Sequence, residues 1–342
     1  MFFIKKIPDY DITFICAKDH EHFAEPILDR LGKKYKIQHL LMVHKRDYWH
    51  FKVKGRVIWC EWANKFAHQV SQRKWQDRRV IVRLHRYEID SVFMKLINWE
   101  NIDNAIFVNS NFENKFKQKV SPDVKTITIP NAIDIDSFPY RSHQYGKSLC
   151  AYGLGFDKRK GYNLLINMFK KLHDIDPEFR LTILGMTINQ AGSLNNLATI
   201  KKQIIDLGLS EKVTIIERDK VSSLVEDRKN ISEIIMKHDI IMSYSENESF
   251  HYSLAEGLLS GLEGFYNMWQ NPLISEFWAN WGYQSEDDLI NGIVNWSKLS
   301  QDEKEKRALT NRNYVSMNFG SKVISKKFEK LFFNDGIANG AS

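Results

Sequence analysis

The segment with the clearest chemical pattern contains two glutamates, Glu248 and Glu256, with seven residues between them. An apolar run ends near Ser243, a polar loop follows, and the spacing of apolar residues predicts a helix that begins near Phe250 or His251. Backbone N–H groups at the start of a helix attract anions. Four residues would present such amides: Ser249, Phe250, His251 and Tyr252. The segment therefore suits a phosphate group.

The two glutamates could bind the uncharged parts of the same ligand. A carboxylate just before the helix can accept hydrogen bonds from sugar hydroxyls, and Glu256, two turns inside the helix, could reach a ribose diol. The alternative is an ordinary strand–loop–helix unit in which both glutamates are solvated or cap the helix. Two glutamates at a fixed spacing occur often by chance, so the pattern alone does not decide between these interpretations.

A basic run, Lys158-Arg159-Lys160, follows the apolar stretch 149–153 and precedes a helical pattern of apolar residues. A loop that follows a strand and opens a helix is a common place for a bound phosphate. Lys160 is the best candidate to pair with a diphosphate, and Lys158 or Arg159 would supply a second positive charge. The alternative is a solvated helix start, which is the commoner role of such a run.

A third group of candidates lies in the first half of the chain. His85 directly follows the apolar run 80–84, and a helical pattern follows it. Ligands of parallel sheets bind at the carboxyl ends of the strands, which favours His85 as a site residue over a structural histidine. Arg86 and Glu88 are weaker candidates. Lys18 and His20, in the polar run after the first strand, are candidates for binding an acceptor.

Short apolar runs alternate with helical patterns along most of the chain, which predicts a parallel sheet with helices on both faces. Strands are expected at 12–17, 37–43, 56–60, 80–84, 105–108 and 124–129, then at 149–153, 179–184, 213–216 and 239–243. Helices are expected up to about 31, at 62–75, 89–97, from 110, at 160–173 and at 325–333. The pattern indicates an α/β protein with two Rossmann-like, doubly wound domains.

The polar, aperiodic stretch 140–147 is the expected linker between these domains. The first domain would span residues 1–143 and the second residues 147–319. A C-terminal helix at about 320–335 would pack back on the first domain.

Residues 245–261 resemble the signature of the retaining GT-B glycosyltransferases of the E-x7-E family, also called glycosyl transferases group 1. Glu248, Phe250, Glu256 and Gly261 fall in register with it, while Ser249 and His251 stand where the family has glycines. Lys160-Gly161 resembles the family's phosphate loop, with Leu154 in place of its arginine. The stretch 129–138 resembles its interdomain segment. After Gly261 the chain departs from the family, which usually continues into a Pro-Val-Val strand.

The resemblance implies the GT-B fold, with two domains facing a cleft, and a nucleotide-sugar donor transferred with retention and without a metal. Glu248 would hold the donor sugar, Glu256 the ribose and Lys160 the diphosphate, while His85 would position the sugar. The acceptor would be a glycan or a lipid-linked sugar, and no cofactor is expected. The alternatives are an inverting GT-B transferase, a nucleotide-sugar epimerase, or a non-catalytic subunit that binds nucleotide or glycan.

Composition limits the other partners. A net charge of +7 and a pI of about 9.0 favour anionic partners without choosing among them. No nucleic-acid-binding motif is present, so no nucleic-acid partner is expected. The two Asp-x-Asp strings, 134–136 and 174–176, are typical of turns, and no metal site is predicted. Cys16, Cys60 and Cys150 lie in apolar runs and are expected to be reduced.

No apolar run approaches the roughly 20 residues of a membrane span. The protein is therefore expected in the cytoplasm, and any membrane contact is expected to be peripheral, at the inner face.

Overall fold

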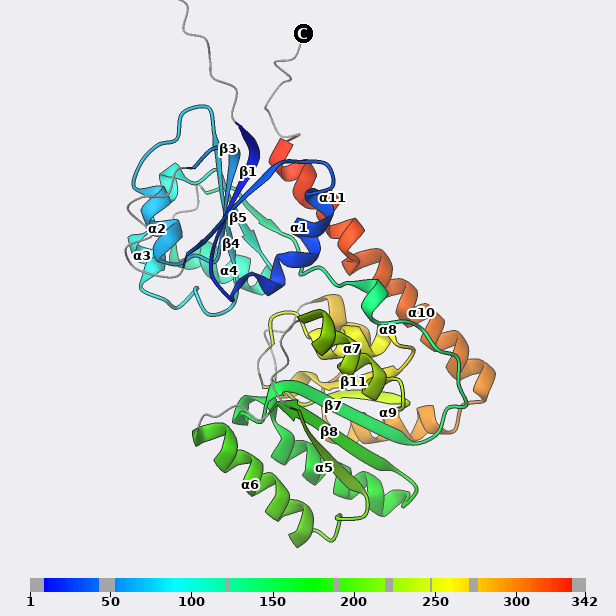
Figure 1. Ribbon diagram of the computed structural model, residues 1–342. Coiled ribbons are helices and arrows are strands. Elements are labelled where there is room, and N and C mark those ends of the chain that lie inside the picture. The colour runs from blue at the N-terminus through cyan, green and yellow to red at the C-terminus, as the bar shows by residue number, and fades with distance from the viewer. Residues whose placement is uncertain are drawn as a thin grey trace, which may run out of the picture. The chain divides into compact units, whose positions relative to one another are not determined.

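The computed structural model of the chain describes residues 9–42, 53–120, 124–186, 191–218, 224–246, 248–270 and 276–333. The chain divides into two compact units (Figure 1). The first unit contains Met1–Ile133 and Phe319–Ser342, and the second contains Asp134–Asn318. Val43, the last residue of one expected strand, lies outside the described residues.

The first unit is built on a six-stranded sheet in the order β2-β1-β3-β4-β5-β6, with every neighbouring pair parallel. The strands are β1 Tyr10–Ala17, β2 Ile37–Met42, β3 Gly55–Glu61, β4 Arg79–Leu84, β5 Asn104–Phe107 and β6 Thr126–Thr128. The helices are α1 Glu25–Leu31, α2 Lys65–Ser71, α3 Phe93–Leu96, α4 Ser110–Lys119 and α11 Ser321–Phe333. Short 3-10 turns span Glu21–Phe23 and Trp99–Asn101.

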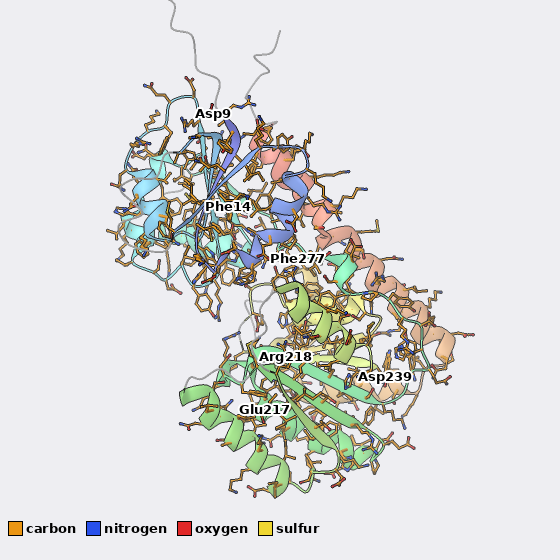
Figure 2. All side chains as sticks on the ribbon, viewed as in Figure 1. Asp9, Phe14, Glu217, Arg218, Asp239 and Phe277 are labelled. Carbon is orange, nitrogen blue, oxygen red and sulfur yellow. The ribbon has the colours of Figure 1, made fainter. Side chains whose placement is uncertain are left out.

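The inner strands β1, β3, β4 and β5 are largely buried on both faces, as the continuous apolar runs predict, whereas the edge strands β2 and β6 are partly exposed. In β1, Ile12 and Phe14 face a core that also contains α1 and α11, whereas Ile15 faces a second core with α2 and α4. Phe14, labelled in Figure 2, packs edge-on against Trp59 of β3 at 4.9 Å between ring centroids. Helix α11 lies beside α1 and contributes Phe328 and other apolar residues to the first core. The C-terminal helix is thus part of the first unit.

The second unit has a six-stranded parallel sheet in the order β12-β11-β10-β7-β8-β9. The strands are β7 Ser148–Gly155, β8 Arg180–Met186, β9 Val213–Arg218, β10 Ile240–Ser243, β11 Glu263–Asn267 and β12 Gly282–Tyr283. The helices are α5 Tyr162–Ile175, α6 Ala191–Asp206, α7 Leu224–Ile235, α8 Tyr252–Leu259, α9 Glu286–Ser297 and α10 Gln301–Phe319. The 3-10 turns are Ile135–Ser137, Lys158–Lys160, Met268–Gln270 and Glu276–Trp281.

Two helices are shorter than the sequence predicts. The helix expected at 62–75 is reduced to α2, because Trp62 has a left-handed backbone (φ 76°) and Asn64 caps the helix by accepting the N–H of Phe66. The helix expected at 89–97 is reduced to α3, after which Ile97 is extended. The left-handed Trp62 and the Asn64 cap thus fix the start of α2, and the spacing of apolar residues reports neither.

The stretch after Gly261, which departs from the family pattern, still forms a strand. All five residues of β11 are buried, and the strand pairs with β10. Gly264 is needed there, because a Cβ at that position would lie 2.7 Å from a Leu254 methyl group of α8. The sequence Glu-Gly-Phe-Tyr-Asn contains no β-branched residue, which explains why no strand is expected from it.

The division between the units falls at Ile133, ahead of the expected linker at 140–147. That polar stretch packs on the second unit. The Tyr145 ring is part of its core, and the Tyr145 hydroxyl donates to the carbonyl of Gly261 at 3.3 Å. The Tyr140 hydroxyl donates to Glu305 of α10. The polar residues at 140–147 are therefore part of the second unit, with side chains that form hydrogen bonds to it, and do not form a linker between the units.

Three further expectations concern the whole chain. Cys16, Cys60 and Cys150 are buried and form no disulfide. Among the residues whose positions are described, no helix is long and apolar enough to cross a membrane. The same residues contain no group of three or more histidine, cysteine or carboxylate side chains arranged to hold a metal ion.

Candidate active site

The candidate residues of the second unit lie at the point where the order of strands in its sheet reverses, between β7 and β10. From β7 the sheet continues through β8 to β9, and from its neighbour β10 it continues through β11 to β12. Ligands of doubly wound sheets bind outside the carboxyl ends of the strands at such a switch point. The loop after β7 contains Arg159 and Lys160, and the loop after β10 contains Glu248. The two loops touch, because the N–H of Glu246 donates to the carbonyl of Arg159 at 2.9 Å.

Glu248 is held between two cations. Its Oε1 accepts hydrogen bonds from Nζ of Lys160 at 2.7 Å and from Nη1 of Arg159 at 2.9 Å. Burial opposes ionisation of this carboxyl, but the charges of Lys160 and Arg159 lower its pKa well below the usual range. Lys158 is exposed. Arg159, rather than Lys158, is therefore the second cation beside Lys160.

Gly161 allows this arrangement. Its backbone is left-handed (φ 65°), and a Cβ there would lie 2.2 Å from the carbonyl oxygen of Tyr244, at the start of the Glu248 loop. Only glycine accepts both the conformation and the close approach. Gly153 of β7 leaves room for the Lys160 side chain, which would have to shift because a Cβ at Gly153 would lie 2.7 Å from Lys160 Cε. The small residues of this phosphate-loop pattern thus bring the lysine and the glutamate together.

Gly208 provides a matched control for Gly161, because it has a similar φ of 67° but nothing within 4 Å of an added Cβ. Gly208→Ala is expected to lower the free energy of unfolding by about 1 kcal/mol through backbone strain alone. Gly161→Ala is expected to cost about 1–3 kcal/mol more, because the Cβ must also displace the Tyr244 carbonyl. Chemical denaturation of both variants measures the difference, and equal losses would show that the close approach is unimportant.

The start of α8 lies one or two residues later than expected. His251 is its N-cap residue and has a left-handed backbone (φ 57°), which accounts for the family's glycine at this position. The His251 side chain is buried beside the Tyr266 ring at 5.2 Å, and burial lowers its pKa to about 4, so the ring is neutral at pH 7. It packs into the protein instead of lying open at the loop surface.

The other residues around the helix start differ in how far they are buried. The Phe250 ring is buried and packs against Trp278 at 5.5 Å between centroids, so its side chain belongs to the core. Ser249 and Tyr252 are half-buried. For Phe250, only the backbone amide is available for the anion-binding role predicted from the sequence. That role stays a prediction for all four amides.

Glu256 lies inside α8 and is 9% exposed. Burial alone raises the pKa of its carboxyl well above the usual range. A carboxyl in such a place is stabilised by any hydrogen-bonding group that approaches it, and a ribose diol would supply two. Its contact with ribose remains a prediction.

In the first unit, His85 follows β4 and is almost fully buried, with 3% exposure. Its ring stacks on the Trp62 ring at 4.0 Å and lies 4.9 Å from the Phe23 ring. Nε2 bonds to Oε1 of Glu61 at 2.8 Å, which assigns the proton to Nε2. Burial lowers the His85 pKa to about 4 although Glu61 opposes this, so the ring is neutral at pH 7. His85 is thus held within the protein by other side chains.

The weaker candidates near His85 have different surroundings. Glu88 is buried, its Oε2 accepts the N–H of His85 at 2.9 Å, and burial raises its pKa to about 7. Arg86 is half-buried, with its guanidinium 4.4 Å from the exposed Tyr87 ring. Lys18 and His20 are exposed in the loop after β1, at the same edge of the sheet. Glu88 therefore shapes the loop, whereas the Lys18 and His20 side chains are exposed to solvent.

Glu61 and Arg83 are two buried charged residues of this group that were not predicted from the sequence. Nη1 of Arg83 donates to Oε1 of Glu61 at 2.9 Å, with both side chains fully buried, and Nη2 of Arg83 donates to Asn131. A cation inside the apolar run 80–84 and a carboxylate closing the run 56–60 were the available signals. Trp62, beside Glu61, adds a left-handed backbone at a bulky residue, which is found mainly at functional or strained sites.

The comparisons with known proteins concern the fold. No protein-family model and no curated protein sequence matches the chain. Sucrose-phosphate synthase from Thermosynechococcus elongatus is 13% identical with a TM-score of 0.72, over 95% of this chain and 98% of that protein. HepE from Anabaena, solved with UDP and glucose, is 13% identical with a TM-score of 0.72, over 95% and 100%. The chain has the GT-B fold. TarM from S. aureus is 14% identical with a TM-score of 0.61, over 81% of this chain and 54% of TarM.

The GT-B fold explains the two groups of candidate residues. Doubly wound α/β units generally bind ligands outside the carboxyl ends of their strands. The Glu248 group lies at this edge of the second unit and the His85 group at this edge of the first. A cleft shared by the two units stays a prediction.

Proposed function

We propose that this protein is a retaining glycosyltransferase, which moves a sugar from a nucleoside-diphosphate sugar to a hydroxyl of a glycan or lipid-linked acceptor. The observation that supports it most is the fixed group of Arg159, Lys160 and Glu248 at the switch point of the second sheet. It combines cations for a diphosphate with an ionised carboxylate for sugar hydroxyls. HepE, which shares the fold, was solved with UDP-glucose, and a TarM complex contains UDP and alpha-GlcNAc-glycerol.

In the proposed reaction, the bond between the sugar and the diphosphate breaks while the acceptor oxygen attacks from the same face. Negative charge grows on the diphosphate, and a cation already held in place stabilises it without further reorganisation. Lys160 and the amides at the start of α8 would do this. A diphosphate oxygen takes the acceptor's proton, so no protein base is required. Family resemblance supports retention and the absence of a metal.

The remaining residues would bind and orient the donor. Glu248 would accept hydrogen bonds from sugar hydroxyls while its second role is to hold Lys160 and Arg159 in position. Glu256 would bind the ribose. Neutral His85, with its proton on Nε2 committed to Glu61, would position the sugar and would not act as an acid at pH 7. Lys18, His20 and Arg86 would contribute to acceptor binding.

A thermal-shift screen over UDP-, GDP-, CDP- and ADP-sugars tests donor binding. One nucleotide sugar is expected to stabilise the folded protein, by about 2.7 kcal/mol at a hundredfold excess over Kd. Proton NMR of the product formed with that donor is then expected to show the anomeric configuration of the donor. No stabilisation by any of the four would contradict the proposal, and an inverted product would indicate an inverting transferase.

The acceptor separates the proposal from its rivals. An epimerase would convert the donor without any acceptor, whereas a transferase requires one. A non-catalytic subunit is favoured by Leu154, where the family has an arginine, and by Ser249 and His251, where it has glycines. Such a subunit would bind the donor in the same screen but transfer no sugar to any acceptor.

A further inference from the structure

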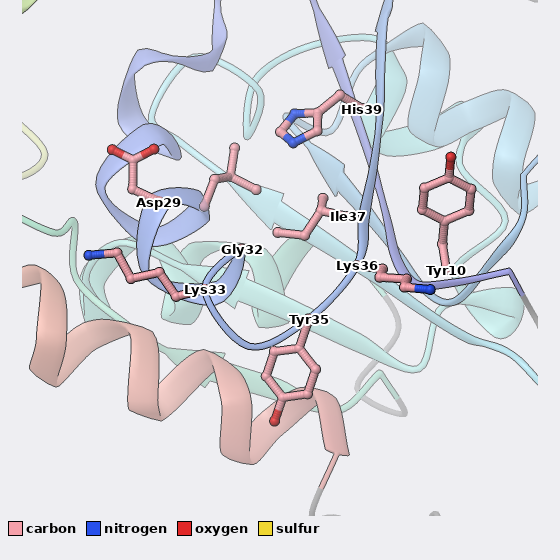
Figure 3. A pocket seen from close by; sticks show the side chains of 9 residues that line it. Tyr10, Asp29, Gly32, Lys33, Tyr35, Lys36, Ile37 and His39 are labelled. Atoms are coloured by element: carbon pink, nitrogen blue, oxygen red, sulfur yellow. The ribbon is translucent and has the colours of Figure 1, made fainter.

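A second surface of the first unit has the composition of a binding site. Two adjoining hollows, of about 580 and 150 Å³, both include Tyr35 in their walls. Figure 3 shows the larger one, formed by the end of α1, the turn after it and the starts of β1 and β2. The smaller hollow lies between the end of α1 and α11. We call the two together the basic groove.

The basic groove lies at the opposite edge of the sheet from the His85 group. Tyr10 and Ile37, which line it, are the first residues of β1 and β2. His85 and Glu61 instead lie at the carboxyl ends of β4 and β3. A strand of the length of β1 spans about 26 Å. The groove is therefore separate from the candidate active site, and a ligand that reached both edges would have to exceed about 25 Å.

Positive charge dominates the groove. Six cationic side chains line it, against the two carboxylates Asp29 and Glu329. The cations are Arg30, Lys33, Lys34, Lys36, Lys322 and Lys326. Within the described parts of the chain, only Lys34 makes an ion pair, with Glu329. Lys327 and Lys330, exposed on α11, extend the positive surface. Gathered like charges repel one another, and an anionic partner would relieve that repulsion.

Two tyrosines give the groove a second property. The Tyr35 ring stacks on Phe333 at 4.4 Å between centroids, and its hydroxyl donates to Glu329 at 2.7 Å, so the ring is fixed. Tyr10 lies in the wall of the larger hollow, with Nζ of Lys54 5.8 Å from its ring centre. Rings with an apolar face and a polar tip, set beside cations, suit a chain of sugars that carries acidic groups.

The shape argues against a membrane as the partner. A peripheral protein needs apolar side chains that enter the bilayer in addition to a basic surface. The large apolar residues recorded as exposed in this unit are Leu41, Tyr87, Val92 and Leu96, and none of them lines the groove. The groove is concave and its exposed side chains are mainly lysines, which favours a soluble polyanion.

We infer that the basic groove binds a linear anionic glycan, whose phosphate or carboxylate groups pair with the lysines while its sugar rings contact Tyr10 and Tyr35. The inference rests on the proposed function, since this glycan would be the acceptor polymer. The groove then selects acceptors by length and charge. Short acceptors react without contacting it, whereas a long anionic chain is held at both edges of the sheet.

The test measures binding of the full chain to a long, fluorescently labelled polygalacturonate, with neutral dextran as the comparison. The variant Lys33→Glu, Lys36→Glu, Lys326→Glu is expected to raise Kd at least about tenfold at low salt. The matched variant Lys74→Glu, Lys95→Glu, Lys237→Glu changes net charge equally at exposed positions outside the groove, and should change Kd less than about threefold. Unchanged melting temperatures show that both variants fold.

Three results would overturn the inference: equal loss in both variants, equal binding of dextran, or tighter binding to anionic lipid vesicles or single-stranded DNA than to the glycan. The first shows an effect of net charge alone, and the last shows a membrane or nucleic-acid surface. Because no donor is present, failure of the proposed function leaves this measurement unaffected. If the protein proves to be a transferase, the groove variant should also raise KM for long anionic acceptors and leave short ones unchanged.

Discussion

Replacing Glu248 by alanine is expected to lower kcat/KM for sugar transfer by roughly 100-fold or more. The change removes the acceptor of the donor-sugar hydroxyls. It also removes the carboxylate that holds Lys160 and Arg159, at 2.7 and 2.9 Å, so Lys160 loses this partner while Arg159 keeps its 3.6 Å contact with Asp157. An electrostatic effect of this kind depends on placement, because a cation that must move during the reaction loses most of its advantage. Initial rates with the donor found by the thermal-shift screen measure the change.

Glu246 supplies the control for this experiment. It lies two residues away in the same loop, its side chain is exposed, and its recorded contact is a backbone one, from its N–H to the Arg159 carbonyl. Glu246→Ala is therefore expected to keep nearly full activity while making the same change in net charge. Full turnover by Glu248→Ala would show that the site has been assigned to the wrong residues, even if donor binding is confirmed.

Replacing Arg83 by methionine is expected to lower the free energy of unfolding by about 3–5 kcal/mol. Arg83 and Glu61 have fully buried side chains, and removal of the cation leaves the Glu61 charge in a place that water does not reach. His85, which is neutral, offers one hydrogen bond but no compensating charge. Denaturation by urea, followed by circular dichroism, measures the loss.

The Arg56–Asp11 pair of the same unit tests whether burial is the cause. It has the same N–O distance of 2.9 Å, but its side chains are 47% and 25% exposed. Arg56→Met is expected to cost less than about 1 kcal/mol, because water solvates the remaining carboxylate. The double variant Arg83→Met, Glu61→Gln should recover part of the loss, since no buried charge remains. Similar losses at the exposed and buried pairs would contradict this explanation.

Several features of the fold could be predicted because they depend on neighbours in the chain. A strand buried on both faces needs a continuous apolar run, and such runs predict ten of the twelve strands found in the described residues. The strands missed are β11 and β12. The first contains Glu, Gly and Asn where apolar residues are typical, and the second has only two residues. Helix limits were predicted less well, because single capping residues such as Asn64 set them.

For the candidate site as well, the sequence identifies some residues but not the contacts between them. Lys160, Gly161 and Glu248 could be named from their types and their positions after apolar runs. Their contact could not, since it joins residues almost ninety positions apart and arises only when β7 and β10 pair.

The sequence by itself determined the fold class and the basic run in the loop after β7, because alternating apolar patterns and turn residues act over short distances along the chain. The tertiary structure alone decided that His85 is enclosed by Trp62 and Glu61, and that β11 is a strand. It also brought Arg30 of α1 and Lys326 of α11, nearly three hundred residues apart, to one groove. The physical reason is that burial and electrostatic interaction depend on distance in space, which sheet pairing and helix packing establish.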